Sequence, residues 1–174
     1  MNPNGSGLLQ LTSVAGRNIV PTLSPDGSKI AFASERNGGV LHIFLMNPDG
    51  SNVEQLTFGQ DPDSEPAWSP DSSRIAFTRI PFSPLGLGFT QKDVWIVDRN
   101  GANLRRLTDT LGEDHDPVFS PDGTRIAYSS ERAIVPNPPF GDTWVINVAQ
   151  GANDPGINLT SDLAFGAGDP AWHP

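Results

Sequence analysis

Short apolar segments alternate with turn-forming residues along the whole chain, and none of them shows the period of an amphipathic helix. Polar and apolar residues alternate from Arg74 to Thr78, which predicts a half-buried strand. The run from Asp93 to Asp98 is apolar between its end residues, as expected of a strand packed on both faces. Residues 66–69 and 103–108 have the length and flanking turn residues of two further strands. The pattern predicts a unit of four short strands joined by tight turns.

This unit recurs along the chain. Ser-Pro-Asp occurs at 24–26, 69–71 and 120–122, each time followed by a small pair and a basic-Ile-Ala-aromatic segment. Leu-Thr occurs four times, with spacings of 45, 51 and 52 residues. Repeats of about 40–50 residues with four strands each are typical of propeller blades. The sequence therefore predicts an all-β fold, a β-propeller of four-stranded antiparallel blades.

The repeats divide one domain, residues 1–174. Complete repeats are expected at about 13–57, 58–108 and 109–160, and partial repeats at 1–12 and 161–174. Since a propeller ring needs about four to eight blades, we expect it to be closed only by oligomerisation or as part of a longer chain. A homodimer of about six blades in total is one solution, and a fragment of a longer propeller is the other.

The motifs together resemble the TolB-like β-propeller repeat family, with its WD-like Pro-Asp repeats, over nearly the whole chain. The resemblance implies a non-catalytic scaffold that mediates protein or peptide binding, in the bacterial periplasm or another exported setting. Two alternatives remain open. The chain is a gating propeller of a prolyl oligopeptidase-like hydrolase whose catalytic domain is absent here, or a purely structural, self-assembling repeat unit.

Charge narrows the class of partner. The chain carries 20 acidic and 11 basic residues, for a net charge of −9, which argues against nucleic acid, whose phosphates need clustered Lys and Arg. Cationic or neutral partners are favoured. No apolar run approaches the roughly 18 residues of a membrane span, and the absence of cysteine rules out disulfide and thiolate chemistry.

Binding is expected on the blade face that carries the second-to-third and the inter-blade connections, because long loops on a rigid scaffold commonly bind partners. The second-to-third connection of the second repeat is long and apolar, with Phe82, Leu85, Leu87 and Phe89. Such a loop either meets a partner or folds back over its own blade edge. The adjacent inter-blade loops carry the remaining candidate binding residues: Asp61, Asp63, Glu65, Glu113, Asp114, His115 and Asp116.

These carboxylates have three interpretations. Glu65 and Asp116, together with Asp169 at the matching position, accept backbone hydrogen bonds beside the proline that follows each of them. Alternatively, the carboxylates bind a cationic ligand or partner segment, or they hold a metal. Alternating carboxylates suit calcium, but the loop lacks the glycine and distal glutamate of an EF-hand. We therefore expect no cofactor and no metal, with calcium only weakly supported.

Catalysis is not expected. The chain has no Gly-x-Ser-x-Gly, no His-Glu-x-x-His and no phosphate-binding glycine loop. His115 alone stands among carboxylates, and no candidate nucleophile accompanies it. Trp95 and Trp144, with Phe44 at the matching position, recur once per repeat and are interpreted as core packing. The sequence therefore predicts a binding scaffold and not an enzyme.

Overall fold

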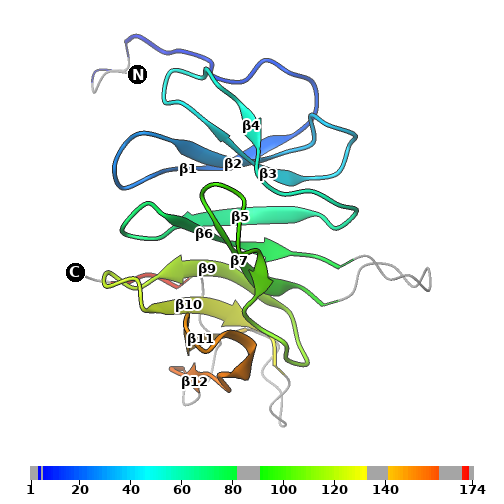
Figure 1. Cartoon of the computed structure of the whole chain (residues 1–174), viewed down its shortest axis with the longest axis vertical. Helices are drawn as coiled ribbons and strands as arrows, with labels where there is room; N and C mark the ends of the chain where they lie inside the picture. The colour runs from blue at the N-terminus through cyan, green and yellow to red at the C-terminus, as the bar shows by residue number, and fades with distance from the viewer. Residues whose placement is uncertain (1–3, 5, 82–90, 133–140, 161–169, 173–174) are drawn as a thin grey trace.

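The computed structural model describes all residues except 1–3, 5, 82–90, 133–140, 161–169 and 173–174, and the described part contains twelve strands (Figure 1). The first sheet contains β1 (Asn18–Leu23), β2 (Ile30–Ser34), β3 (His42–Met46) and β4 (Glu54–Gln55). The second contains β5 (Asp63–Trp68), β6 (Arg74–Arg79), β7 (Asp93–Asp98) and β8 (Arg105–Arg106). The third contains β9 (Asp114–Phe119), β10 (Arg125–Ser130), β11 (Asp142–Asn147) and β12 (Ile157–Asn158), with a 3₁₀ turn, η1 (Gly151–Asn153), before β12.

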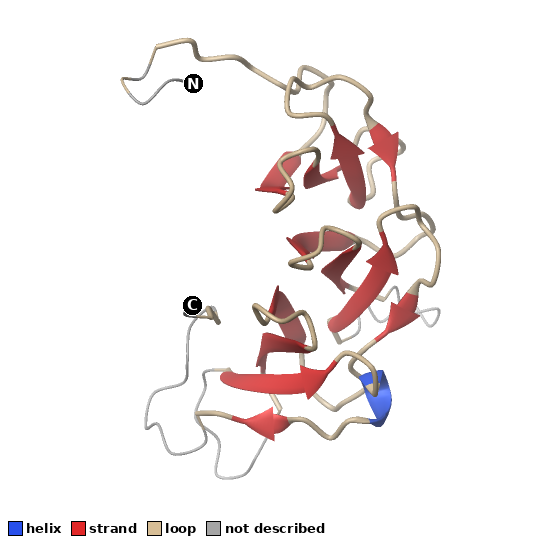
Figure 2. Ribbon diagram, turned by 60° about the vertical axis from the view of Figure 1, so that its left-hand side comes forward, coloured by secondary structure: helices blue, strands red, loops and turns tan. Residues whose placement is uncertain are grey.

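Each sheet is an antiparallel meander whose strands lie side by side in sequence order. The three sheets, here called blades 1 to 3, follow one another along an open arc (Figure 2). The first strands β1, β5 and β9 contact one another across neighbouring blades. The all-β architecture of four-stranded antiparallel blades predicted from the repeats is confirmed, and three blades leave the ring open. Among the described residues no helix is long and apolar enough to cross a membrane.

The strands of blade 2 show where the sequence pattern was accurate. β7 spans the predicted residues, and β6 extends one residue further, to Arg79. The fourth strand is shorter than the predicted 103–108, because only Arg105 and Arg106 pair regularly with β7. The backbone N–H groups of the next two residues both donate to the Val94 carbonyl, at 2.8 and 3.3 Å, so the regular ladder ends there.

The core lies between the blades. In the first interface, small and branched side chains of blade 1, among them Ala31 and Ile43, pack against Ile75, Phe77 and Val97 of blade 2. The corresponding faces of blades 2 and 3 also pack together, and Leu107 of the Leu-Thr motif at 107–108 is fully buried there. Burial of these apolar faces is the main force that holds successive blades together.

In each of the three blades, the threonine of the Leu-Thr motif fixes the fourth strand to the third. Its hydroxyl accepts the N–H of the second residue of the third strand, from Ile43 to Thr57 at 2.9 Å and from Val94 to Thr108 at 3.0 Å. The leucine beside it turns into the interface with the next blade. At the N-terminal side, Leu11 packs in the same way against the outer cluster of blade 1.

A buried arginine links three strands inside blade 2. The Arg79 guanidinium binds both oxygens of Asp63, at 2.6 and 2.9 Å, and lies 4.7 Å over the Trp95 ring. The Asp63 side chain is fully buried and that of Arg79 is 8% exposed. Arg36 in blade 1 and Arg132 in blade 3 make the corresponding contacts over their own aromatic pairs. This arginine clamp was not predicted from the sequence.

The three Ser-Pro-Asp turns have the same pattern of hydrogen bonds. In the second turn, Asp71 Oδ1 accepts hydrogen bonds from Ser69 Oγ at 2.6 Å, Ser73 N at 3.1 Å and Ser73 Oγ at 2.8 Å. The turns around Asp26 and Asp122 repeat these contacts. Hydrogen bonds to the ionised carboxylate lower its pKa, to about 2 for Asp71 and for Asp122.

These turns predict a loss of stability in acid. A carboxyl whose folded pKa lies below its unfolded value stabilises the fold fully above the unfolded value, about 4, and this contribution disappears as the pH falls through the folded value. We expect the free energy of unfolding to drop between about pH 4 and pH 2, and to drop less steeply in Asp122→Asn. Urea titrations at several pH values test this, with Glu54→Gln, outside the turns, as control. An unchanged slope in Asp122→Asn would contradict the prediction.

Candidate functional site

The first strand of each blade has a bulge at the residue that precedes its proline. Val20, Glu65 and Asp116 have φ values of 50°, 55° and 52°, and the pairing with the second strand shifts register at each of these positions. Non-glycine residues rarely take a positive φ, and a bulge re-aims the side chain it carries. In the first strand of each blade, the bulge therefore turns one side chain out of the usual alternation between the two faces of the sheet. These three side chains occupy corresponding positions in the three blades.

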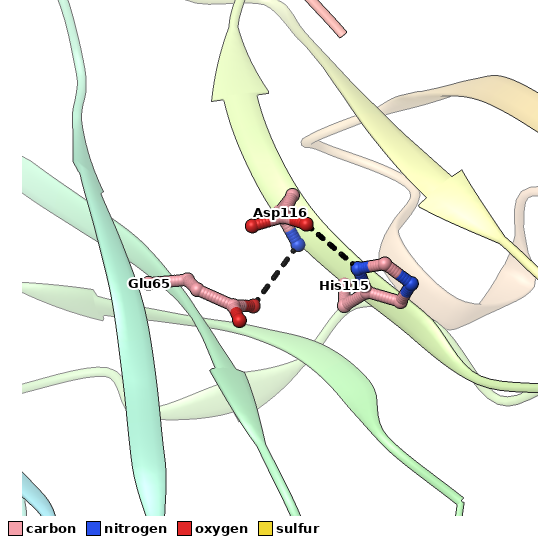
Figure 3. A group of neighbouring side chains, drawn as sticks. All are labelled: Glu65, His115 and Asp116. Atoms are coloured by element: carbon pink, nitrogen blue, oxygen red, sulfur yellow. Dashed lines mark hydrogen bonds and ion pairs between the residues drawn. The ribbon is translucent and has the colours of Figure 1, made fainter. Parts of the chain in front are cut away.

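Two of these side chains meet at the border of blades 2 and 3, together with His115 (Figure 3). Glu65 Oε2 accepts the backbone N–H of Asp116 at 3.2 Å and the Thr78 hydroxyl at 2.6 Å. His115 Nδ1 lies 2.8 Å from Asp116 Oδ2. We call Glu65, His115 and Asp116 the acid–histidine cluster.

Electrostatics within this cluster favour a protonated histidine. The hydrogen bond to the Asp116 carboxylate raises the pKa of His115 above its ordinary value, although partial burial opposes this. Lys92 also acts against protonation but is paired with Glu113 at 2.8 Å. His115 is therefore the one side chain of the cluster expected to change charge near neutral pH.

The imidazole titration is directly measurable. We expect the His115 ring to titrate above about 6.5 in the wild type and at lower pH in Asp116→Asn, because the charged acceptor is gone. Since the folded pKa is the higher one, the pair stabilises the fold below about pH 6.5, and that contribution is lost as the pH rises through the folded value. NMR of the ring protons tests this, with Asp122→Asn as a distant control. A His115 pKa that is unchanged in Asp116→Asn would contradict the assignment.

The cluster opens into a groove along the inner strands. A cavity of about 400 Å³ runs across β1, β5 and β9 and includes Glu65 and Asp116 in its wall. Its remaining lining is mostly apolar or proline, including Pro66, Trp68 and Pro117. We call this the channel groove. Apolar walls with a few converging polar groups are the usual composition of a ligand site.

The other predicted carboxylates have different partners. Asp63 is bound by Arg79, and the buried Asp114 accepts hydrogen bonds from Ser130 Oγ and from Thr110 Oγ1. Glu113 is paired with Lys92, and Asp61 lies half-exposed in the preceding loop. The structure thus separates the alternating series Asp61, Asp63 and Glu65. The apolar loop residues Phe82, Leu85, Leu87 and Phe89 lie outside the described residues.

Within the described part of the chain, the acid–histidine cluster is the group whose ligand-type atoms converge, all lying within 4.8 Å of one another. A histidine and two carboxylates are ligands that several divalent metals accept. However, His115 Nδ1 and Asp116 Oδ2 are already bonded to each other, and Glu65 Oε2 accepts two hydrogen bonds. A metal at these atoms would have to displace those contacts and the imidazole proton.

The sequence did not single out the channel groove. A signal was present, because a proline stands at the same place in each repeat, as Pro21, Pro66 and Pro117. The positive φ of the residue before each proline has no such signal, since local preference at that position favours extended backbone. The sequence therefore located the carboxylates but not the surface that they border.

Comparison with known proteins agrees with the geometry. A family model described as the TolB β-propeller domain matches residues 5–80. A TolB homolog of Chlorobium luteolum is 29% identical over 130 residues, 74% of this chain and 27% of that protein. The chain carries TolB-like β-propeller repeats.

Solved structures extend this likeness across all three TolB-like blades. A putative TolB from Agrobacterium tumefaciens superposes with a TM-score of 0.67 and 26% identity, over 86% of this chain and 52% of that one. TolB from Acinetobacter baumannii gives a TM-score of 0.69 at 22% identity, over 89% and 35%; at that identity the likeness shows the shared fold. The chain thus spans about a quarter to a half of the length of these relatives.

Proposed function

We propose that these TolB-like repeats form a non-catalytic scaffold that binds a protein or peptide segment in the channel groove. The observation that carries the proposal is the groove itself, about 400 Å³ in volume and built from the first strands of all three blades. Trp68 and Phe119 contribute apolar area to the groove lining, and four prolines in that lining give it few backbone donors. An exported, periplasmic setting is part of the proposal and rests on the family resemblance.

The groove can be tested by filling it. Ala67 is a half-exposed groove residue on β5, so Ala67→Phe narrows the groove without removing a contact. Ala102, exposed in the turn after β7, gives the matched variant Ala102→Phe. Peptides selected from a random library against the wild type are then measured by titration calorimetry on all three proteins, with circular dichroism to check the fold.

We expect Ala67→Phe to weaken binding of the selected peptides at least about tenfold, which corresponds to about 1.4 kcal/mol, and Ala102→Phe to leave it unchanged. Peptides that bind both variants like the wild type would place recognition on another surface. A selection that returns no peptide that binds in solution would also count against the proposal.

We also infer that further blades complete the arc, from a second copy or from a longer chain. The outer face of blade 1 bears an open cavity of about 360 Å³ that includes Leu11, Ile30, Phe32 and Met46. The corresponding face of blade 2 is sealed by blade 1. Light scattering after size exclusion separates the two sources: a stable dimer supports the second copy, and a monodisperse monomer excludes it.

A further inference from the structure

Two half-buried carboxylates face each other across the border of blades 2 and 3 with few donors between them. Oxygens of Glu65 and Asp116 lie within 4.8 Å of each other. Each residue has one oxygen, Oε1 of Glu65 and Oδ1 of Asp116, that makes no hydrogen bond to any other described residue. Like charges at this distance repel, so a cation placed between them would be stabilised by both.

The neighbouring charges offset this pair only in part. The amino group of Lys92 is paired with Glu113 at 2.8 Å. The buried Asp114, on the same strand as Asp116, accepts a hydrogen bond from Ser130 Oγ, and Arg132 Nε lies 3.8 Å from Asp114 Oδ1. When His115 is neutral, the cluster therefore keeps two negative charges at the edge of the channel groove, and Lys92 offsets part of the Glu65 charge without forming an ion pair with it.

The separation of the carboxylates fits an ammonium group. Charge-assisted N–H···O bonds are about 2.7–2.9 Å long, so one nitrogen can contact two oxygens that lie within 4.8 Å of each other. The groove lining beside Glu65 and Asp116 is apolar and includes Val20, Pro66 and Pro117. The four-carbon stem of a lysine buries itself on such a wall while its ammonium reaches a polar end.

We propose that Glu65 and Asp116 form the recognition site for a lysine side chain of the segment that occupies the channel groove, and that His115 modulates this site by protonation. The inference rests on the proposed binding function and specifies its ligand chemistry. The net charge of −9 supports it, since long-range attraction brings basic segments to the protein.

Protonation of His115 sets the expected pH dependence. The imidazole nitrogen is 2.8 Å from Asp116 Oδ2, so an imidazolium there cancels one of the two negative charges. The groups that face His115 are Asp116, Glu65 and Lys92, the last with its partner Glu113. Lysine binding should therefore be weaker at pH 5.5 than at pH 8, and His115→Gln should reduce this difference.

The test uses peptides whose termini carry no charge. Acetyl-Ala-Ala-Lys-Ala-Ala-amide and the same peptide with norleucine in place of lysine are titrated into ¹⁵N-labelled protein. The amides of residues 63–68 and 114–119, apart from Pro66 and Pro117, are followed by NMR. A third peptide has norleucine and a free N-terminal amine. Glu65→Gln and Asp116→Asn keep hydrogen-bond acceptors but remove charge, and Glu54→Gln on the outer strand β4 matches the change in net charge of each single variant.

We expect the lysine peptide to shift these amides and the norleucine peptide to bind at least tenfold more weakly. Each single variant, Glu65→Gln or Asp116→Asn, should weaken lysine binding, and the double variant should weaken it about tenfold, whereas Glu54→Gln should leave it unchanged. Equal binding by the two capped peptides, or an unaffected double variant, would overturn the inference. So would tighter binding by the free-amine peptide, which would identify a chain terminus as the ligand.

Two further outcomes distinguish failure of the lysine site from failure of the proposed peptide-binding function. If selected peptides bind the groove but tolerate loss of every lysine, the proposed function stands and the lysine site falls. If no peptide shifts the groove amides, both fall. Titration with ZnCl₂ and CaCl₂ forms the last arm: one-to-one Zn²⁺ binding that requires His115, with no response to the lysine peptide, would identify a metal site instead.

Discussion

Replacing Arg79 with leucine is expected to lower the free energy of unfolding by about 3–5 kcal/mol, the usual cost of leaving one partner of a buried ion pair without the other. Asp63 is fully buried and receives both of its shortest contacts from the Arg79 guanidinium. The substitution also removes the cation from the face of Trp95. Urea unfolding, followed by tryptophan fluorescence, measures the change.

The double variant Arg79→Leu/Asp63→Leu separates charge from packing. Because it removes both charges, it should recover most of the loss. Arg99→Leu is the surface control: its partner Asp26 is 44% exposed, so we expect a cost below about 1 kcal/mol. If the double variant is no more stable than Arg79→Leu, the clamp acts through shape and not through the buried charge.

Truncating Leu107 to alanine should cost about 2–5 kcal/mol, the range for a fully buried leucine. Its side chain has no exposed surface and lies in the core between blades 2 and 3. The Leu107 side chain reaches Gly151 of blade 3. A Cβ atom placed on that glycine would lie 3.5 Å from Leu107 Cδ2. Loss of this side chain therefore loosens two blades at once.

The matched control stands at the same motif position. Leu159 belongs to the last Leu-Thr pair and is 55% exposed, so Leu159→Ala should cost less than about 1 kcal/mol. Chemical denaturation of both variants in parallel gives the comparison. Equal costs would mean that burial between blades does not determine the role of the motif.

Much of the fold was predictable because its signals are local and repeated. The alternation at 74–78 and the apolar run at 93–98 determine strands directly, and the Ser-Pro-Asp turns hold them through contacts two to five residues apart. The fourth strand was overestimated, because its length depends on where two N–H groups share one carbonyl of β7. That detail depends on the packing of Leu107 and is not visible in the residue pattern.

The candidate site was predictable only in part, because it depends on distant pairs. The sequence marked Glu65, His115 and Asp116 as candidates. It could not show that Glu65 meets Asp116, which is 51 residues away, since that contact needs two blades packed together. It also treated Asp63 like its neighbours, whereas the partner that buries Asp63 is an arginine 16 residues further along.

The bulge before each inner-strand proline has a consequence for how such a channel changes over time. Its backbone shape is the same for a valine, a glutamate and an aspartate, so the identity of this side chain is nearly independent of the scaffold around it. Each blade thus contributes one replaceable side chain to the channel groove, and the three side chains together determine its charge and polarity. Val20→Glu would add a third carboxylate at this position and leave the backbone of the bulge unchanged.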